Sequence, residues 1–185
     1  GYFQDFKSKL NKLSKSTAIH STLILDDTSS CKFTKNLPSK LSQGLKITKK
    51  NIVFEKNYWK ISAAHDGYFK KYGVIHDREL EFYPEQMRFI GYDKIINKNN
   101  NKNFKFEIRF HLEPNVKVMK TQDNKSILID LNNEGWKFIS NENDIDISNG
   151  LYFGKKNSFT NNQNIFISGV TDSKNQTIKW ELIKL

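Results

Sequence analysis

The chain of 185 residues contains one cysteine, Cys31. A single thiol cannot form an internal disulfide, and it cannot supply a metal site that needs several cysteines. Because proteins without disulfides occur on both sides of a membrane, this count does not identify a compartment. The sequence therefore excludes a disulfide-stabilised scaffold and a multi-cysteine metal centre.

Long apolar runs and helical periodicity are also scarce. No stretch approaches the length of a membrane-spanning helix, and no signal peptide is visible. Only residues 6–13 show apolar side chains at helical spacing, which predicts at most one short helix near the amino terminus. The abrupt opening at Gly1 and the strand-like end at Leu185 predict a segment of a longer protein.

The composition favours a folded core and a basic surface. Aromatic residues make up 13% of the chain, and each can bury a large apolar area. The formal net charge is +10. Either this charge serves an anionic partner, such as nucleic acid, an acidic membrane surface or an acidic polysaccharide, or it reflects a lineage bias toward Lys and Asn. The lysines are spread along the chain, and no RNA-binding, helix-turn-helix or zinc-finger motif supports nucleic acid.

Alternation of apolar and polar residues dominates the rest of the sequence. Residues 104–112 give the clearest case, because Phe, Ile and Leu occupy every second position and charged residues lie between most of them. About a dozen such segments are separated by polar turns, which is typical of antiparallel sandwiches. The sequence therefore predicts an all-β fold, a large antiparallel two-sheet β-sandwich, as a single domain over residues 1–185.

The four histidines are the first candidates for chemistry, since imidazole binds metals and transfers protons near neutral pH. His20 lies within the alternating segment 18–25, which predicts a position in the middle of a strand. The Ser and Thr residues around it could orient the ring as they orient metal-bound histidines; alternatively, His20 is hydrogen-bonded to a neighbouring strand. His111 closes strand 104–112 on its polar face, which favours a structural role.

The segment His65-Asp66-Gly67-Tyr68 predicts a strand that ends in a tight turn, with Gly67 free to adopt a positive φ. In a functional interpretation, His65 and Tyr68 are exposed at the rim of a cleft. In the structural alternative, the motif is only a turn in which Asp66 satisfies backbone donors.

His76 and Arg78 share one face of the strand that follows. Together they could receive the carboxylate or sulfate of a sugar, with Arg78 binding in a bidentate manner. The alternative is ordinary pairing of these cations with the neighbouring acids at 77, 79 and 81. Neither motif is specific by itself.

In combination, the motifs follow one another in the order of a known family. The segments STAIHSTLILDDTSSC at 16–31, HDGY at 65–68, GVIHDREL at 73–80 and FEIRFHLEPNVK at 106–117 resemble the carboxy-terminal β-domain of heparinase II/III-like polysaccharide lyases, especially those of alphaproteobacteria. The closing segments 135–138, 165–169 and 178–180 are similar as well, so the resemblance covers most of the chain.

This resemblance implies a function. Such lyases join an amino-terminal helical toroid to a β-sandwich, and an acidic glycan, for example a glycosaminoglycan, binds in the cleft between them. They cleave chains that contain uronic acid by β-elimination: a base, usually Tyr or His, removes the C5 proton while nearby groups neutralise the uronate carboxylate. The resemblance implies that this chain forms one wall of the cleft, with His65, Tyr68, His76 and Arg78 as candidate substrate-binding residues, and that its partners are the glycan and the helical domain.

Some members of the family hold a structural zinc in the sandwich, and His20 matches one ligand, a histidine in a Thr-x-x-His-x-Thr context. The other zinc ligands and the catalytic residues are expected upstream of Gly1, so this chain alone is not expected to complete a lyase site. Asp77 stands where the family usually has the first of two arginines, which weakens the anion clamp. The alternative function is a non-catalytic glycan-binding or assembly module. The resemblance favours the periplasm without membrane insertion, and the cytoplasm stays open.

Overall fold

The computed structural model describes residues 8–34, 40–98, 102–140, 144–172 and 174–185. In chain order the elements are α1 (Lys9–Leu13), the 3-10 turn η1 (Thr17–Ile19), β1 (Leu23–Leu25), β2 (Lys32–Phe33), β3 (Leu41–Gln43), β4 (Ile47–Glu55), β5 (Tyr58–His65), α2 (Phe69–Tyr72), β6 (Val74–Tyr83), the 3-10 turn η2 (Pro84–Gln86), β7 (Arg88–Asn97), β8 (Lys105–His111), β9 (Lys117–Lys120), β10 (Ser126–Leu131), β11 (Glu134–Ile139), β12 (Asp144–Tyr152), β13 (Thr160–Val170) and β14 (Gln176–Lys184).

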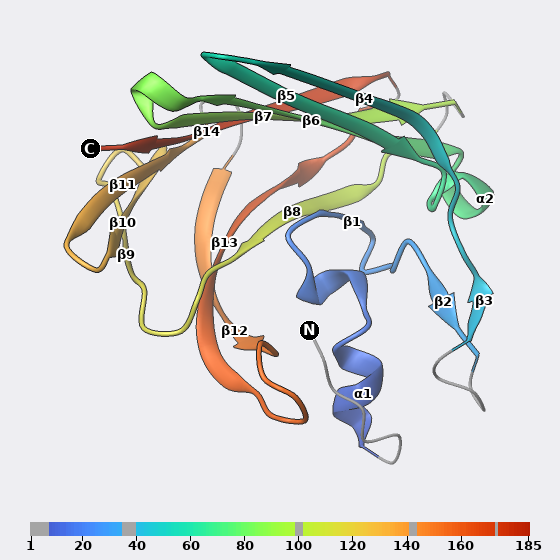
Figure 1. The fold of residues 1–185 in the computed structure, drawn as a ribbon. Helices are drawn as coiled ribbons and strands as arrows, with labels where there is room; N and C mark the ends of the chain where they lie inside the picture. Colours follow the sequence, from blue (N-terminus) through green and yellow to red (C-terminus); the bar gives the residue numbers. More distant parts are fainter. Residues whose placement is uncertain (1–7, 35–39, 99–101, 141–143, 173) are drawn as a thin grey trace.

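The strands form two large sheets that face each other (Figure 1). The larger sheet has eight strands in the order β4-β5-β6-β7-β14-β11-β10-β9, and the smaller has four in the order β1-β8-β13-β12. Strands β2 and β3 form a separate ribbon, and all the paired strands of the described residues run antiparallel. This arrangement confirms the predicted all-β, two-sheet sandwich.

The hydrophobic core lies between the two sheets. Phe110 of β8 packs against Phe138 of β11 and Trp180 of β14, with ring centroids 4.7 Å apart in both pairs. Ile108 of β8 and Ile178 of β14 belong to the same core and are fully buried. The alternation that predicted the strand at 104–112 therefore separates the core face of β8 from its polar face.

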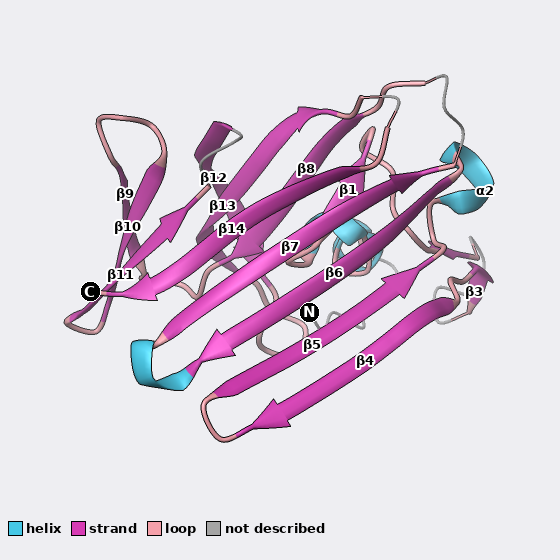
Figure 2. Cartoon of the chain, turned by 90° about the horizontal axis from the view of Figure 1, so that it is seen from above, coloured by secondary structure: helices cyan, strands magenta, loops and turns pink. Residues whose placement is uncertain are grey.

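The eight-stranded sheet extends beyond the four-stranded one. Seen from above, β4 and β5 lie at the edge farthest from β8, β13 and β12 (Figure 2). The amino-terminal segment with α1, η1 and β1 lies on the inner side of the large sheet (Figure 1). Part of that inner face is therefore not covered by the smaller sheet.

The predicted strand through His20 is wrong. Residues 17–19 form η1 instead, His20 follows it in an exposed position, and β1 begins only at Leu23. The reason is side-chain bonding to the backbone: the Thr17 N–H donates to Ser29 Oγ at 3.1 Å, and Thr17 Oγ1 accepts from the Ser30 N–H at 2.9 Å. Such bonds draw Ser and Thr out of strand pairing.

Two further elements differ from expectation in detail. The strand predicted to carry His76 and Arg78 begins at Val74, after a short helix that the sequence did not predict. Residues 69–72 form α2, and Gly73 ends it with a left-handed φ of 70°. The predicted helix at 6–13 is present as α1 over Lys9–Leu13, and its first part lies outside the described residues. None of the helices in the described ranges is long and apolar enough to span a bilayer.

Candidate functional site: a buried carboxylate and two histidines

Three neighbouring strands bring the central motifs together on the inner face of the large sheet. His65 of β5 pairs with His76 of β6, and Arg78 of β6 pairs with Asp93 of β7. Residues two apart on a strand share a face, and His76 lies opposite the core residue Ile95. The four polar side chains therefore point toward the interior of the sandwich.

Asp93 is the centre of this cluster and is completely buried. Its Oδ1 accepts from His76 Nε2 at 2.6 Å and from Arg78 Nε at 2.7 Å. Its Oδ2 accepts from Arg78 Nη2 at 3.0 Å and from Trp180 Nε1 at 2.9 Å. Four donors and one guanidinium charge thus compensate a carboxylate that burial alone would destabilise.

The electrostatics of Asp93 follow from these contacts. Burial by itself raises the pKa of this carboxyl, but the Arg78 charge and the hydrogen bond from His76 outweigh it and hold the pKa well below its usual value. Asp93 is therefore ionised at neutral pH. All three guanidinium nitrogens of Arg78 make a hydrogen bond, since its Nη1 donates to the Ser21 carbonyl as well.

The two histidines form a directed chain of hydrogen bonds that ends on Asp93. The Gly67 N–H donates to His65 Nδ1 at 3.2 Å, so a neutral His65 carries its proton on Nε2. His65 Nε2 lies 3.3 Å from His76 Nδ1, which leaves the proton of His76 on the nitrogen that faces Asp93. Burial, together with the neighbouring His76, lowers the pKa of His65 to about 4, so the neutral form persists at neutral pH.

Gly91 makes room for the fourth donor. A Cβ at this position would lie 2.1 Å from the Trp180 ring, which crosses directly over the β7 backbone. Because the indole lies against the glycine, its N–H reaches the carboxylate two residues further along the strand. Gly67 also serves a close contact, because its Cβ would lie 2.8 Å from the Ser30 carbonyl oxygen. Its φ is not positive, which differs from the sequence expectation.

Tyr68 connects the site to the smaller sheet. Its side chain is 1% exposed, and its hydroxyl donates to the Leu23 carbonyl of β1 at 2.7 Å. The expected position at an exposed rim is therefore not what the structure has. Asp66 fits the turn alternative, because its Oδ1 accepts from the Lys46 N–H at 2.6 Å.

The structure thus brings His65, His76 and Arg78 into one cluster, with Tyr68 beside His65 at a ring distance of 6.0 Å. It pairs Arg78 with Asp93 on the next strand and not with its sequence neighbours, and Asp77 instead binds Lys49 at 2.9 Å. Sequence reasoning missed Asp93. The available signal was a lone carboxylate on the face of β7 that also carries Gly91 and Ile95.

His20 is exposed, and the residue that follows it, Ser21, accepts from Arg78 through its carbonyl. In the described part of the chain, no group of three or more His, Cys, Asp or Glu side chains could hold a metal ion. His20 alone provides one nitrogen, whereas a zinc site in a protein takes three or four protein ligands. The described residues therefore do not complete a zinc site. His111 is structural in its contacts, since its Nε2 lies 3.0 Å from the Ala18 carbonyl oxygen.

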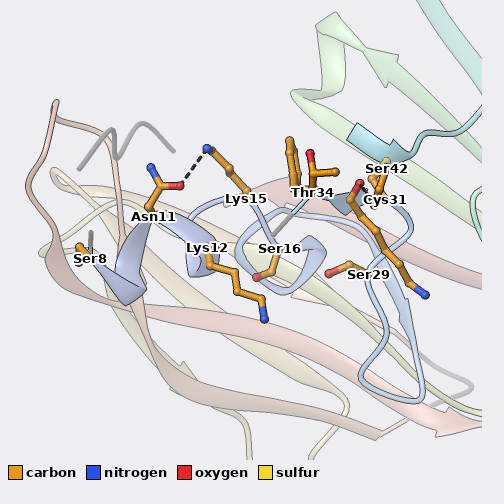
Figure 3. Close-up of a pocket in the computed structure, with 11 residues that line it drawn as sticks. Ser8, Asn11, Lys12, Lys15, Ser16, Ser29, Cys31, Thr34 and Ser42 are labelled. Atoms are coloured by element: carbon orange, nitrogen blue, oxygen red, sulfur yellow. Dashed lines mark hydrogen bonds between the residues drawn. The ribbon is translucent and has the colours of Figure 1, made fainter. Parts of the chain in front are cut away.

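A separate cavity of about 770 Å³ lies between α1 and the segment that carries β2 and β3 (Figure 3). Three lysines are among its lining residues: Lys12, Lys15 and Lys32. Lys15 Nζ donates to Asn11 Oδ1 at 2.9 Å and lies over the Phe33 ring. Ser and Thr are frequent among the remaining lining residues, and no carboxylate is among the described lining residues. The cavity is therefore bordered by cations, although most of its wall is apolar.

The fold is that of solved lyase structures. The heparan sulfate lyase HepC from Pedobacter heparinus superposes with a TM-score of 0.74 at 13% identity, over 95% of this chain and 25% of that one. The structure titled "Heparinase III-BT4657 gene product" gives a TM-score of 0.72 at 10% identity, over 100% of this chain and 27% of that one. The chain thus spans about a quarter of the length of these structures. No curated protein matches it.

The sequence itself matches one family profile, described as "Heparinase II/III-like, C-terminal", over residues 1–181. This range includes the described strands of both sheets except the last three residues of β14. The chain therefore belongs to the heparinase II/III-like C-terminal domain family.

Proposed function

We propose that this domain is the β-sandwich of a polysaccharide lyase that cleaves uronic-acid-containing glycans by β-elimination. The observation that carries the proposal is the family match over residues 1–181. Both solved structures described above are about four times as long as this chain, and one is titled a heparan sulfate lyase. In this proposal the rest of the parent chain supplies an amino-terminal helical domain, and the sandwich forms one wall of the cleft between them.

The cationic cavity supports an acidic substrate. Lys12 and Lys32 are exposed at its wall (Figure 3). The hydroxyls of Ser8 and Ser29, which accept from backbone N–H groups, can donate to sulfate or carboxylate oxygens. The chain as a whole carries a net charge of +10, which attracts polyanions in general. The specific contribution of the cavity is a group of lysines without a competing carboxylate among the lining residues that the structure describes.

Within the histidine cluster, we assign two different roles to the four candidate substrate-binding residues. His65 is half-buried and the Arg78 side chain is 20% exposed, so these two can meet a ligand. His76 and Tyr68 are buried and act as positioning residues: His76 orients His65 and Asp93, and Tyr68 holds the turn against β1. Because Asp93 already neutralises Arg78, the cluster orients a sugar more than it binds charge.

The activity test uses the full-length parent protein with heparan sulfate as the probe. Release of unsaturated uronate, followed by its ultraviolet absorbance, is the expected result, because β-elimination leaves a double bond in the product sugar. Binding of the probe without release of product would overturn the lyase proposal and favour the non-catalytic glycan-binding module. Binding of DNA that disappears at moderate salt would identify the charge as a nonspecific attraction.

The cavity is tested by lysine removal. The double variant Lys12→Ala/Lys32→Ala is expected to raise the KM for the sulfated probe several-fold while kcat stays constant, with a smaller effect at high salt. Lys117→Ala, at an exposed position of strand β9, is the matched control and should change neither constant. An unchanged KM in the double variant would remove the cavity from the substrate path.

We also propose that His20 contributes one ligand to a structural zinc whose other ligands lie outside the described residues. The support is its exposed position after η1 and the matching Thr-x-x-His-x-Thr context. Metal analysis of the full-length protein should give less zinc for His20→Ala than for the unmodified chain. Equal zinc content in both proteins would contradict this assignment.

A further inference from the structure

The inner face of β4–β7 carries a large apolar surface outside the core. Two rows of side chains cross these strands side by side. One row contains Phe54, Trp59, Phe82 and Phe89, which pair in register from β4 to β7; the other contains Ile52, Ile61 and Leu80. These seven residues are called the aromatic face below.

The rings of the aromatic face stack on one another. The centroid distance is 5.1 Å for Phe54 and Trp59, 5.1 Å for Trp59 and Phe82, and 4.2 Å for Phe82 and Phe89. The same face continues along the strands into Arg78 and Asp93, and across Gly91 to the core residue Trp180. The aromatic face is therefore an extension of the core face of the sheet beyond the area that the smaller sheet covers.

The surface is unusually large and apolar for a solvent-facing sheet. Six of its members are 36 to 74% exposed. With about 200 Å² for each large side chain, these fractions amount to roughly 600 Å² of contiguous apolar surface, the upper end of what isolated soluble domains expose. The opposite face of the same strands shows the usual solution, since it carries paired charges such as Lys60 with Glu79 and Arg88 with Glu181.

We propose that the aromatic face docks the amino-terminal part of the parent chain that precedes residue 1. The proposal rests on the proposed function to the extent that it assumes a parent lyase of the length of the solved structures, of which this chain covers about a quarter. The amino-terminal segment with α1 lies on the same side of the large sheet as the aromatic face (Figure 1).

A glycan fits this surface less well than a protein chain. Sugar sites combine apolar contacts with several placed hydrogen-bonding groups. Among the seven side chains of the aromatic face, Trp59 alone carries a hydrogen-bonding group, its indole N–H. Two cations border it on the same face: Arg78, which Asp93 already binds, and the exposed Lys50 beside Ile52. One lysine and one indole N–H offer an acidic glycan few polar contacts, whereas an apolar protein surface would find complementary contacts.

The test is hydroxyl-radical footprinting of the full-length protein, read by mass spectrometry at Phe54 and Trp59. Met119 on β9, at the opposite edge of the same sheet and 63% exposed, is the internal control. Each rate is compared with that of the same residue in the denatured protein. We expect several-fold protection of Phe54 and Trp59, and little protection of Met119, at every protein concentration and without added glycan.

Three results would overturn the proposal. Phe54 and Trp59 could react as freely as Met119, or become protected only when heparan sulfate is added, or become protected only at high protein concentration. The second result would indicate a sugar platform, and the third a contact between two copies of the chain. Because no variant is needed, the outcome does not depend on how a substitution folds.

A charge substitution provides the second measurement. Phe54→Lys in the full-length protein should restore the reactivity of Trp59 and lower the thermal midpoint, while Met119→Lys should leave both unchanged. The lyase assay separates this inference from the proposed function. Protection of Trp59 without release of unsaturated uronate refutes the lyase function and supports the docking face. Release of unsaturated uronate with a reactive Trp59 supports the lyase function and refutes the docking face.

Discussion

Removing the negative charge of Asp93 should be among the most damaging conservative changes in the domain. Asp93→Asn keeps the shape but replaces one acceptor oxygen with an NH₂ group that faces N–H donors. The carboxylate now accepts two bonds from Arg78, one from His76 and one from Trp180. After the substitution Arg78, 20% exposed, keeps its charge without a counter-ion.

The expected loss is large for a single amide. Removing one partner of a buried ion pair costs about 3–5 kcal/mol, and a hydrogen bond to a charged group contributes about 1.5–3 kcal/mol. Because the amide oxygen can still accept one or two of the four bonds, we expect the free energy of unfolding to fall by about 3–5 kcal/mol and not by the sum of all four contacts. Urea denaturation followed by tryptophan fluorescence measures it, and Trp180 is itself one of the donors.

Asp146→Asn is the matched control. Asp146 is 61% exposed and lies 3.8 Å from Lys120, so this pair should contribute at most about 1 kcal/mol. A loss below about 1 kcal/mol for Asp93→Asn would refute the reasoning, because it would mean that water or rearranged side chains satisfy Arg78 and His76. In the double variant Arg78→Met/Asp93→Asn, the free energy of unfolding should fall by less than the sum of the two single losses. The reason is that removing both partners leaves no unpaired charge in the site.

Three further predictions concern the same region. Between about pH 6.5 and pH 4 the unfolded chain binds a proton at His65 that the folded protein does not. The free energy of unfolding should therefore fall as the pH is lowered through this range, by up to about 3 kcal/mol. Denaturation at several pH values checks this, and His65→Gln should make the free energy of unfolding less dependent on pH. Gly91→Ala places a Cβ within the Trp180 ring and should cost about 1–3 kcal/mol or more, whereas Gly135→Ala, whose Cβ would lie 3.5 Å from Leu185, should be close to neutral; equal thermal midpoints would contradict this. Tyr68→Phe leaves the buried Leu23 carbonyl without its donor and should cost about 1–3 kcal/mol in urea denaturation; no change would show that another donor replaces the hydroxyl.

Elements whose pattern is local could be predicted from the sequence. The alternation at 104–112 predicts β8 because the polarity of each side chain indicates whether it lies on the core face or on the polar face of the strand. The segment around His20 was predicted as a strand because its alternation is equally regular. The bonds from Thr17 to Ser29 and Ser30, which come from more than ten residues away, decide against it. Helix α2 has four residues, too few for a periodic signal.

The candidate site was predictable only in part, for a related reason. His65, His76 and Arg78 could be singled out by residue type and by motif order. Asp93 becomes their common partner only once β5, β6 and β7 pair in one register, which no single segment encodes. The access of Trp180 to the same carboxylate depends in addition on Gly91 in the strand beside it. The contacts that give the site its chemistry are therefore between strands.

The hydroxyl of Tyr68 has a consequence for how the domain can associate. Strand β1 is an edge strand, and such an edge can recruit a foreign strand through its unpaired carbonyl and N–H groups. Here Tyr68 occupies the Leu23 carbonyl, and the Thr28 N–H occupies the Leu25 carbonyl at 2.8 Å. These two acceptors are unavailable for edge-to-edge β-sheet growth. The domain is thereby protected on this side from strand exchange and from the templated pairing that leads to aggregation.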